Sequence, residues 1–247
     1  AGGAAHGLQC RLRPAAGRAE RERPLPSAPV SIRNLDRLLR PRSVAVFGAS
    51  NRPQSVGAVV MRNLLRGGFA GPVMPVNPRH QAVAGVLAYP DVKSLPLVPE
   101  MAVLCTPPAT VPGIVRALAE AGTRTAIVLT AGLDRTTDDR GRPLTEALGE
   151  AMGRCGFRLL GPNCLGLLVP EVGLNASFAH VDALPGHLAF VSQSGALCTA
   201  VLDWARGAEV GFSCFASVGE ALDVDVADLL DWFGADPGTR AILLYLE

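Results

Sequence analysis

Short apolar runs alternate with amphipathic segments between residues 43 and 160 of this chain. The runs have the length of buried strands, and the segments between them carry apolar residues at helical spacing. We predict strands at Ser43–Phe47, Pro72–Val76, Met101–Cys105, Thr125–Thr130 and Phe157–Leu160, and helices at Val56–Arg66, Val111–Ala121 and Pro143–Arg154. Strands alternating with helices in this way are typical of a parallel, doubly wound α/β sheet.

A second alternation follows a less regular stretch, Leu167–Pro185. Its predicted strands are Leu188–Val191, Gly211–Ala216 and Ala241–Leu246, and its predicted helices are Ala196–Arg206 and Val224–Phe233. Since only these strands fit before residue 247, we expect the second domain to be incomplete.

We therefore predict one domain over residues 31–165, a connecting segment over 166–184 and a partial domain over 185–247. Residues 1–30 are rich in Arg, Ala, Pro and Gly without periodicity, which predicts a disordered tail. Ser31–Leu39 has the spacing of a short amphipathic helix. The chain starts without Met and stops directly after a strand-like run, so we expect a fragment of a longer protein.

Composition narrows the classes of function. Hydrophobic residues make up 49% and charged residues 18% of the 247 residues, enough for a sizeable core. The net charge of +1 gives no reason to expect nucleic acid as a partner. No apolar run reaches the length of a membrane span, and the N-terminus lacks the apolar region of a secretory signal. We expect a cytoplasmic protein without a membrane partner.

The six cysteines form no C-x-x-C pair, and no histidine stands at ligand spacing from them, so we expect no metal site. Most cysteines lie in or beside apolar runs, which indicates buried thiols in a reducing compartment. His6 lies in the predicted tail, and His80, His180 and His187 stand outside any catalytic motif.

The loop from Gly48 to Gly57 follows the first strand and precedes the first helix, the place where a doubly wound sheet binds a nucleotide phosphate. It is not G-x-G-x-x-G, because Ser50 replaces the second glycine. After the second strand stand Asn77, Pro78 and Arg79 instead of an acidic residue, which favours a nucleotide with an additional phosphate over plain NAD. The alternative is a tight glycine turn that binds no ligand.

Two further strand ends, Cys105–Pro108 and Thr130–Leu133, would lie beside that loop at the carboxyl edge of the sheet. Taken alone, both have the composition of ordinary strand-to-helix turns.

Two glycine-bearing loops mark the second half of the chain, Gly161–Gly166 and Ser192–Gly195. Each follows an apolar strand, and Ser192–Gly195 also opens a helix, so its free backbone N–H groups and hydroxyls suit an anion such as phosphate. Cys164 lacks a neighbouring base and fits a structural thiol better than a nucleophile.

Carboxylates give weaker signals in this region. Glu247 would stand at the active edge after the last strand, although it could equally be an ordinary solvated terminus. Asp223, Asp225 and Asp228 fit the polar first turn of a helix better than a metal site.

Five stretches, in this order, resemble the NDP-forming acyl-CoA synthetase superfamily, which includes the α subunit of succinyl-CoA synthetase. They are Ser43–Ser50, Pro75–Pro78, Leu160–Gly166, Phe190–Gly195 and Ile242–Glu247. The resemblance covers roughly residues 36–247. It implies a Rossmann-like CoA-binding domain followed by the first part of a flavodoxin-like ligase domain.

The resemblance also implies a ligand and its residues. CoA or acetyl-CoA would contact Gly48, Ala49, Ser50, Asn51, Asn77, Pro78, Arg79, Thr106, Pro107, Pro108, Thr130, Ala131 and Gly132. A phosphate loop would include Asn163, Cys164, Ser192, Gln193, Ser194 and Gly195. Glu247 would orient a phosphohistidine that lies beyond this chain. ATP or ADP with Mg would bind only in the missing part of the parent, in the remaining chain or in a second subunit with a nucleotide-grasp domain, and a homo-oligomer is expected.

Further stretches, such as Gly173–Phe178 and Leu202–Ala205, resemble the Pat-type protein lysine acetyltransferases, whose synthetase-like region senses a ligand. Two departures from active synthetases favour this parent: Gly219-Glu220 replaces Gly-Asn, and Gly132–Arg135 replaces Gly-Phe-x-Glu. We expect a CoA-binding module that is inactive alone, from an acetyltransferase or from an ADP-forming acetate-CoA ligase. A stand-alone NAD(P)-binding domain is the weaker alternative.

Overall fold

The computed structural model describes residues 2, 30–153 and 156–247. The predicted disordered tail, with His6 and Cys10, lies almost wholly outside the described residues, as does Cys155. The first sheet has the strand order β2-β1-β5-β6-β7, and all neighbouring pairs are parallel. Its strands are β1 (Val44–Phe47), β2 (Val73–Val76), β5 (Met101–Leu104), β6 (Thr125–Val128) and β7 (Arg158–Leu160). The predicted doubly wound parallel sheet is confirmed.

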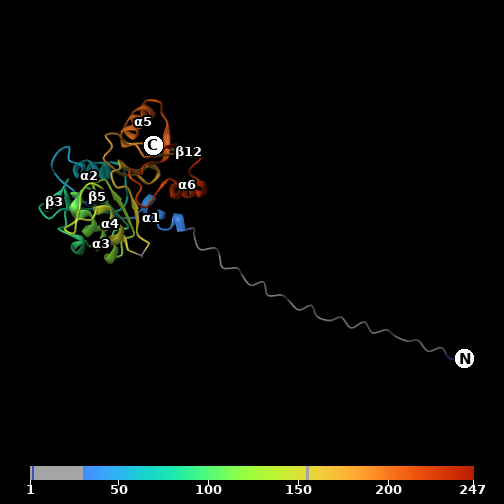
Figure 1. The fold of residues 1–247 in the computed structure, drawn as a ribbon. Helices are drawn as coiled ribbons and strands as arrows, with labels where there is room; N and C mark the ends of the chain where they lie inside the picture. Colours follow the sequence, from blue (N-terminus) through green and yellow to red (C-terminus); the bar gives the residue numbers. More distant parts are fainter. Residues whose placement is uncertain (1, 3–29, 154–155) are drawn as a thin grey trace.

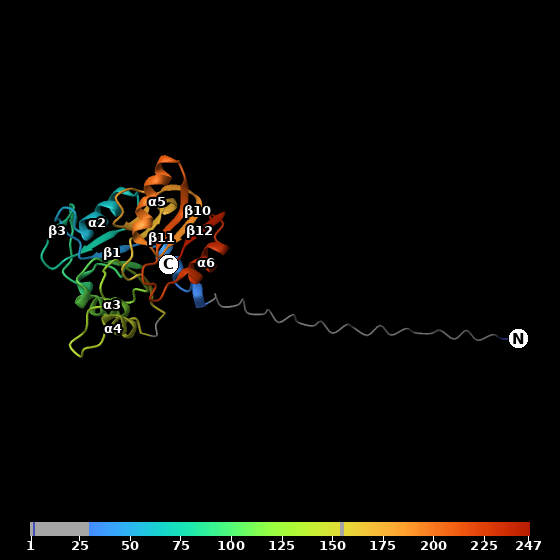
Figure 2. The same ribbon diagram turned by 45° about the horizontal axis from the view of Figure 1, so that its top comes forward.

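Helices cover both faces of this sheet (Figures 1 and 2). On one face, α3 (Val111–Ala121) and α4 (Leu144–Met152) pack against alternate strand residues such as Ala45 and Leu104. On the other face, α1 (Leu35–Leu39) and α2 (Val56–Arg66) pack against Val46 and its neighbours. Two-sided burial explains why these strands are continuous apolar runs instead of alternating ones.

The second sheet has the order β12-β10-β11-β8-β9. The three strands predicted for this region are present as β10 (Leu184–Ser192), β11 (Gly211–Ser217) and β12 (Ala241–Tyr245). β10 pairs in parallel with both β11 and β12. The helix α5 (Gly195–Gly207) packs on one face of this sheet around Phe190 and Phe215, and α6 (Val226–Ala235) packs on the other through Leu229 and Phe233.

The stretch predicted to be less regular contains two strands, β8 (Gly166–Val169) and β9 (Leu174–Ser177), joined by the short 3-10 helix η4 (Pro170–Val172). They form an antiparallel hairpin, and β8 also pairs antiparallel with β11. All eight strand residues are buried, so the half-buried alternation that marks a hairpin in a sequence is absent. This hairpin extends the second sheet into the segment predicted to connect the domains.

The remaining elements are short. They are the two-stranded hairpin of β3 (Ala82–Val83) and β4 (Val86–Leu87), and the 3-10 helices η1 (Val30–Ile32), η2 (Val92–Ser94) and η3 (Pro108–Thr110). Among the described residues, no helix is long and apolar enough to cross a membrane.

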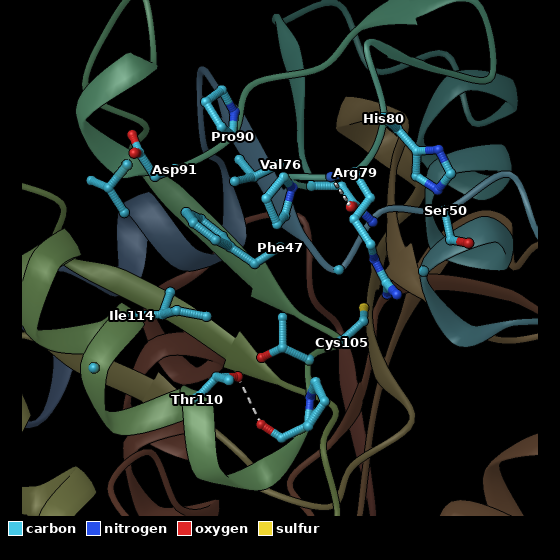
Figure 3. Close-up of a pocket in the computed structure, with 18 of the residues that line it drawn as sticks. Phe47, Ser50, Val76, Arg79, His80, Pro90, Asp91, Cys105, Thr110 and Ile114 are labelled. Carbon is cyan, nitrogen blue, oxygen red and sulfur yellow. Dashed lines mark hydrogen bonds between the residues drawn. The ribbon is translucent and has the colours of Figure 1, made fainter.

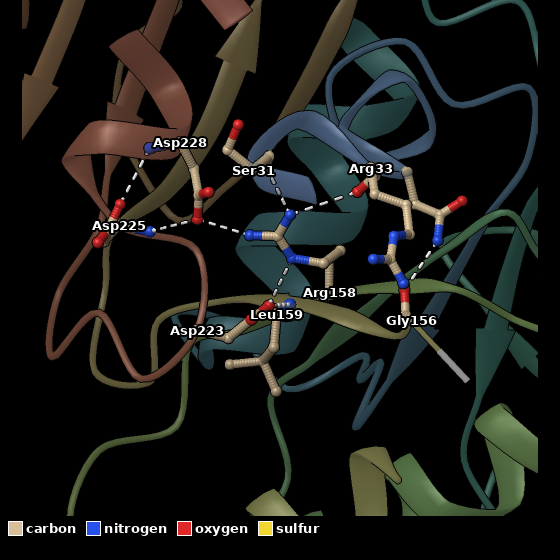
Figure 4. A network of polar contacts seen from close by, with 9 residues as sticks. Ser31, Arg33, Gly156, Arg158, Leu159, Asp223, Asp225 and Asp228 are labelled. Atoms are coloured by element: carbon tan, nitrogen blue, oxygen red, sulfur yellow. Dashed lines mark hydrogen bonds and ion pairs between the residues drawn. The ribbon is translucent and has the colours of Figure 1, made fainter. Parts of the chain in front are cut away.

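The two sheets are joined by polar contacts of one buried arginine. Arg158 on β7 is 9% exposed and forms ion pairs with Asp223 at 3.0 Å and Asp228 at 2.5 Å (Figure 4). Its guanidinium also donates to the carbonyl oxygen of Ser31 at 2.6 Å. Arg158 therefore ties the first sheet, the η1 segment and the start of α6 together.

Candidate functional site

Glycine is required where the N-terminus of α2 meets the end of β1. Gly48 has φ +81°, and a Cβ there would lie 2.7 Å from the carbonyl oxygen of Cys105. A Cβ at Gly57, in the first turn of α2, would lie 2.0 Å from the carbonyl oxygen of Gly48. The absence of both side chains lets the N-terminus of α2 approach the ends of β1 and β5, the geometry used to bind a nucleotide phosphate.

A cavity of about 1210 Å³ opens at this place and is called the first cavity here. In Figure 3, Ser50, Arg79 and His80 lie on one side of it, and Phe47 and Ile114 lie on the other. Its other main lining residues are Gly48, Arg52, Ser55, Gly57, Val76, Asn77, Pro78, Pro90, Asp91, Val92, Lys93, Thr106, Pro107 and Thr110. An apolar side and a cationic side suit a ligand that joins an aromatic base to phosphates.

Hydrogen bonds hold the loops around the first cavity in place. The Asn77 amide is 8% exposed and donates to the carbonyl oxygen of Ala49 at 2.7 Å, while its Oδ1 accepts from the Arg79 N–H at 2.9 Å. Asn51 donates to the carbonyl oxygen of Ala82 at 2.9 Å. Ala49 and Asn51 do not line the cavity, so their place in the structure is to support the loop.

The segment Pro90–Lys93 carries lining residues that the sequence reasoning missed. Tyr89 forms a parallel bridge with Val76, and its N–H donates to the carbonyl oxygen of Pro75 at 2.9 Å. This bridge brings Lys93, the only lysine of the chain, and Asp91 to the end of β2. An isolated bridge leaves no periodic pattern in the sequence, so this contact could not be predicted.

A second cavity of about 610 Å³ lies between the two sheets' loops. It combines strand ends of the first sheet with the N-terminus of α5 and with Glu247. Its lining residues are Val56, Cys105, Thr106, Leu129, Thr130, Ala131, Asn163, Cys164, Leu165, Phe178, Gln193, Ser194, Gly195, Ala196 and Glu247. Glu247 is the only charged residue among them.

Polar contacts shape the anion side of the second cavity. The Ser194 N–H donates to Ser192 Oγ at 3.0 Å, which curls the turn at the start of α5. The Gln193 side chain accepts from the Glu247 N–H at 2.8 Å, and its own backbone N–H donates to the carbonyl oxygen of Tyr245 at 3.1 Å. Ser192 is fully buried and does not line the cavity, so it supports the turn from behind.

The Gly161–Gly166 loop is held by both halves of the structure. The Asn163 N–H donates to the carbonyl oxygen of Thr130 at 3.1 Å, and the Glu220 N–H donates to that of Pro162 at 3.0 Å. A Cβ at Gly219 would lie 2.3 Å from the Pro162 oxygen, so glycine is needed for this close approach. The loop thereby places Asn163 in the wall of the second cavity.

The two cavities adjoin, since both are lined by Val56, Cys105 and Thr106. Thr106 Oγ1 is buried and has no hydrogen-bond partner in the structure, whereas its carbonyl oxygen accepts from Thr130 Oγ1 at 2.7 Å. A buried hydroxyl without a partner is costly, and it is where a bound polar group would be stabilised. One ligand could therefore extend from the first cavity past Thr106 into the second.

The cysteines near the cavities are not activated. Burial raises the pKa of the Cys164 thiol to about 12, and Cys164 donates to the carbonyl oxygen of Val128 at 3.5 Å. Burial likewise raises the pKa of the Cys105 thiol to about 12. A thiolate, the reactive form, is therefore disfavoured at both. This agrees with the prediction of a structural thiol at Cys164.

Three predicted aspartates have structural partners. Asp225 caps α6 by accepting from the Asp228 N–H at 3.0 Å, and Asp223 and Asp228 pair with Arg158. Burial raises the pKa of the Asp228 carboxyl, opposed by the charge of Arg158. Among residues 30–153 and 156–247, no group of three or more His, Cys, Asp or Glu is arranged to hold a metal ion.

Most of the remaining predicted site residues line one of the cavities. Pro108 and Gly132 do not, although they adjoin Pro107 and Ala131, which do. His80, for which the sequence showed no motif, lines the first cavity. His180 instead pairs with Asp203 at 2.7 Å on the surface, and His187 contacts the carbonyl oxygen of Gly238 at 2.9 Å.

Comparison with known protein families agrees with this geometry. Residues 42–170, more than half of the chain, match the family described as CoA binding domain. Residues 185–247 match the family described as succinyl-CoA ligase like flavodoxin domain. The chain belongs to the NDP-forming acyl-CoA synthetase superfamily. The fold expected from that resemblance, a Rossmann-like domain followed by part of a flavodoxin-like domain, is confirmed.

Relatives within this superfamily are ligases. The α subunit of acetate–CoA ligase (ADP-forming) I from Pyrococcus furiosus is 36% identical over 218 residues, which are 87% of this chain and 47% of the relative. Acetate–CoA ligase (ADP-forming) I from Archaeoglobus fulgidus is 37% identical over 86% of this chain and 31% of its own length. This chain thus spans less than half the length of these two curated relatives.

A solved structure has the same fold. Acetyl-coenzyme A synthetase 1 from Ca. Korarchaeum cryptofilum, in complex with phosphate and ADP, superposes with a TM-score of 0.80 at 39% identity. The match covers 86% of this chain and 45% of that one.

Proposed function

We propose that this chain binds CoA or an acyl-CoA, with the nucleotide in the first cavity and the thioester end in the second. The observation that carries this proposal is the junction at Thr106, where two cavities adjoin beside an unpartnered hydroxyl. CoA joins an adenine nucleotide to a long, polar pantetheine arm, so it is a ligand of the required length and chemistry.

The first cavity offers suitable groups at each end of the nucleotide. Phe47, Val76 and Ile114 provide an apolar surface for the base, and the N-terminus of α2 with Arg79 suits the phosphates. Asn77 Oδ1 accepts from the Arg79 N–H, so the backbone that carries the Arg79 guanidinium is held in an ordered turn. We assign the additional phosphate of CoA to Arg79.

The second cavity has groups for a phosphate or an acyl phosphate. Gly195 begins α5, a helix of 13 residues capped by Ser194, and the free N–H groups of its first turn favour an anion. Asn163 and Gln193 add amide groups that can donate hydrogen bonds. Glu247 stands at the same cavity, where it would accept a hydrogen bond from an imidazole supplied by the remainder of the parent.

For the parent we propose an ADP-forming acyl-CoA ligase, in which ATP or ADP with Mg binds outside this chain, in the following segment or in a partner subunit. The relatives described above are ligases, which supports this parent over a Pat-type acetyltransferase. The two sequence departures that favoured the acetyltransferase do not lie at the cavities. Glu220 is exposed outside both linings, and Asp134 and Arg135 pair with one another at 3.5 Å on the surface.

Calorimetric titration of the 247-residue chain with CoA, dephospho-CoA and NADP tests the binding proposal. We expect CoA to bind more tightly than dephospho-CoA, and NADP to bind weakly. Loss of the Arg79 charge in Arg79→Met should weaken CoA by about tenfold or more, because a charged hydrogen bond to phosphate is lost. The affinity for dephospho-CoA should hardly change.

Arg116→Met is the matched control, because Arg116 is exposed on α3 and outside the cavity. If both variants weakened CoA binding equally, Arg79 would act only through the overall charge of the protein and not through contact with the phosphate. Failure of the folded chain to bind any CoA species would overturn the proposal. Gly48→Val is unsuitable for this purpose, since its side chain would collide with the Cys105 backbone and unsettle the fold.

A further inference from the structure

Phe178 is a large aromatic residue that lines the second cavity while remaining 37% exposed. It follows directly after β9, which is the second strand of the hairpin that extends the second sheet. Most apolar residues of this chain of similar size are buried, including all three phenylalanines of the core around α5. An aromatic ring left open at a cavity wall is available to contact a ligand.

The backbone at Phe178 is fixed from three directions. The Phe178 N–H donates to the carbonyl oxygen of Leu165 at 3.2 Å. The Asn63 amide of α2, itself 8% exposed, donates to the carbonyl oxygens of Ser177 at 2.9 Å and Ala179 at 2.8 Å. The residues on both sides of Phe178 are therefore held by α2, which fixes the backbone from which the ring extends.

The lining of the second cavity contains polar and apolar residues. The polar residues, called the polar part here, are Thr106, Thr130, Asn163, Gln193, Ser194 and Glu247. The apolar residues, called the apolar part, include Val56, Leu129, Ala131, Leu165, Phe178 and Ala196. An acyl phosphate or thioester would place its reacting carbonyl at the polar part, so the body of the acyl group would meet the apolar part.

Within the apolar part, Leu129 and Leu165 are 7% and 2% exposed and so form the floor of the cavity without projecting into it. Val56 is shared with the first cavity and therefore lies along the path of the pantetheine arm. Phe178 remains as the bulky, accessible side chain that belongs to the second cavity alone.

We propose that the Phe178 ring limits the size of the acyl group that this chain accepts, as a specificity-determining residue. The inference rests on the proposed function, because it assumes an acyl-CoA in the two cavities. Short acyl groups would fit between the ring and the α5 N-terminus, whereas longer chains would meet the ring.

The test measures dissociation constants of the 247-residue chain for CoA, acetyl-CoA, butyryl-CoA and hexanoyl-CoA by calorimetry. For the unaltered chain we expect hexanoyl-CoA to bind more weakly than acetyl-CoA. Phe178→Ala should shift the ratio of hexanoyl to acetyl affinity by about tenfold toward the longer chain, within the discrimination that pocket size provides. Phe178→Leu should give a smaller shift in the same direction.

Trp204→Ala is the control, since Trp204 is 64% exposed on α5 and outside both cavities. Free CoA should bind equally to all four proteins. If Phe178→Ala and Phe178→Leu bind CoA normally and leave the acyl ratio unchanged, the inference is overturned and the proposed function stands. If the unaltered chain binds no CoA species, the proposed function fails and this inference fails with it. Should Phe178→Ala not fold, Phe178→Leu alone decides.

Discussion

Replacement of Arg158 by methionine should destabilise the protein far more than replacement of a surface arginine. Arg158 is 9% exposed and holds two carboxylates, Asp223 and Asp228, which are 26% and 14% exposed. Methionine keeps most of the length of the side chain but leaves both carboxylates without their cation. Removal of one partner of a buried ion pair costs about 3–5 kcal/mol, and the partial exposure of the carboxylates places the expected loss at about 3 kcal/mol.

Urea unfolding followed by circular dichroism measures this loss as a lower midpoint at an unchanged slope. For a domain of this size, a loss of about 3 kcal/mol corresponds to a fall in Tm of roughly 6–12 °C. The effect should spread to both sheets, because Arg158 also holds the carbonyl oxygen of Ser31 and faces the start of α6 (Figure 4).

Arg135→Met is the matched control. Arg135 also pairs with a carboxylate, Asp134, but the two side chains are 89% and 49% exposed, so its loss should hardly change the urea midpoint. Equal costs for the two variants would refute the argument that burial gives the Arg158 ion pairs their importance. A changed slope in urea would mean that Arg158→Met alters the compactness of one state instead of the stability alone.

Three further outcomes follow from the structure. Gly57→Ala should lower the midpoint of urea unfolding because its Cβ would lie 2.0 Å from the backbone oxygen of Gly48. Gly149→Ala, exposed in α4 with no atom within 4 Å, should not lower it, and equal midpoints for the two variants would contradict the close approach. When the native protein is treated with iodoacetamide at about pH 8, Cys164 should stay unmodified in peptide mass spectra, since a pKa of about 12 leaves roughly one thiolate in 10⁴. Rapid labelling of Cys164 would contradict this. Burial raises the pKa of Asp228 above its ordinary value of 3.8, so the folded state binds the proton more tightly than the unfolded state. The free energy of unfolding, measured relative to Asp228→Asn, should therefore fall as the pH rises from 3.8 through the raised pKa, and then level off. A rise of that free energy in the same pH window would contradict burial as the main cause.

The strands and helices of both sheets were largely predictable because local burial leaves a period in the sequence. The helices α2 and α3 begin and end at the predicted residues, Val56–Arg66 and Val111–Ala121. Both have one buried face and a clear end, at Gly67 and Gly122. The hairpin of β8 and β9 escaped prediction, since its residues are buried on both faces and its strands are only four residues long.

The candidate site was predictable in part. Parallel strands bring their carboxyl ends to one edge, so Gly48, Thr106 and Thr130 could be grouped from their positions after predicted strands alone. The distinction between Ala49, which accepts from the buried Asn77 amide, and Ser50, which lines the first cavity, needed the structure. Neighbours in a loop look alike in a sequence, whereas the direction of each side chain depends on the backbone around it.

By itself, the sequence determined the parallel strands of both sheets and the main helices, the superfamily to which the chain belongs, and which strand ends meet. Only the tertiary structure decided that Lys93 and His80 reach the first cavity, that the two cavities adjoin at Thr106, and that Asn63 fixes the backbone around Phe178. Asn63 and its two acceptors are 114 and 116 residues apart. Contacts over such separations depend on how whole elements pack, and no local pattern of hydrophobic and polar residues records them.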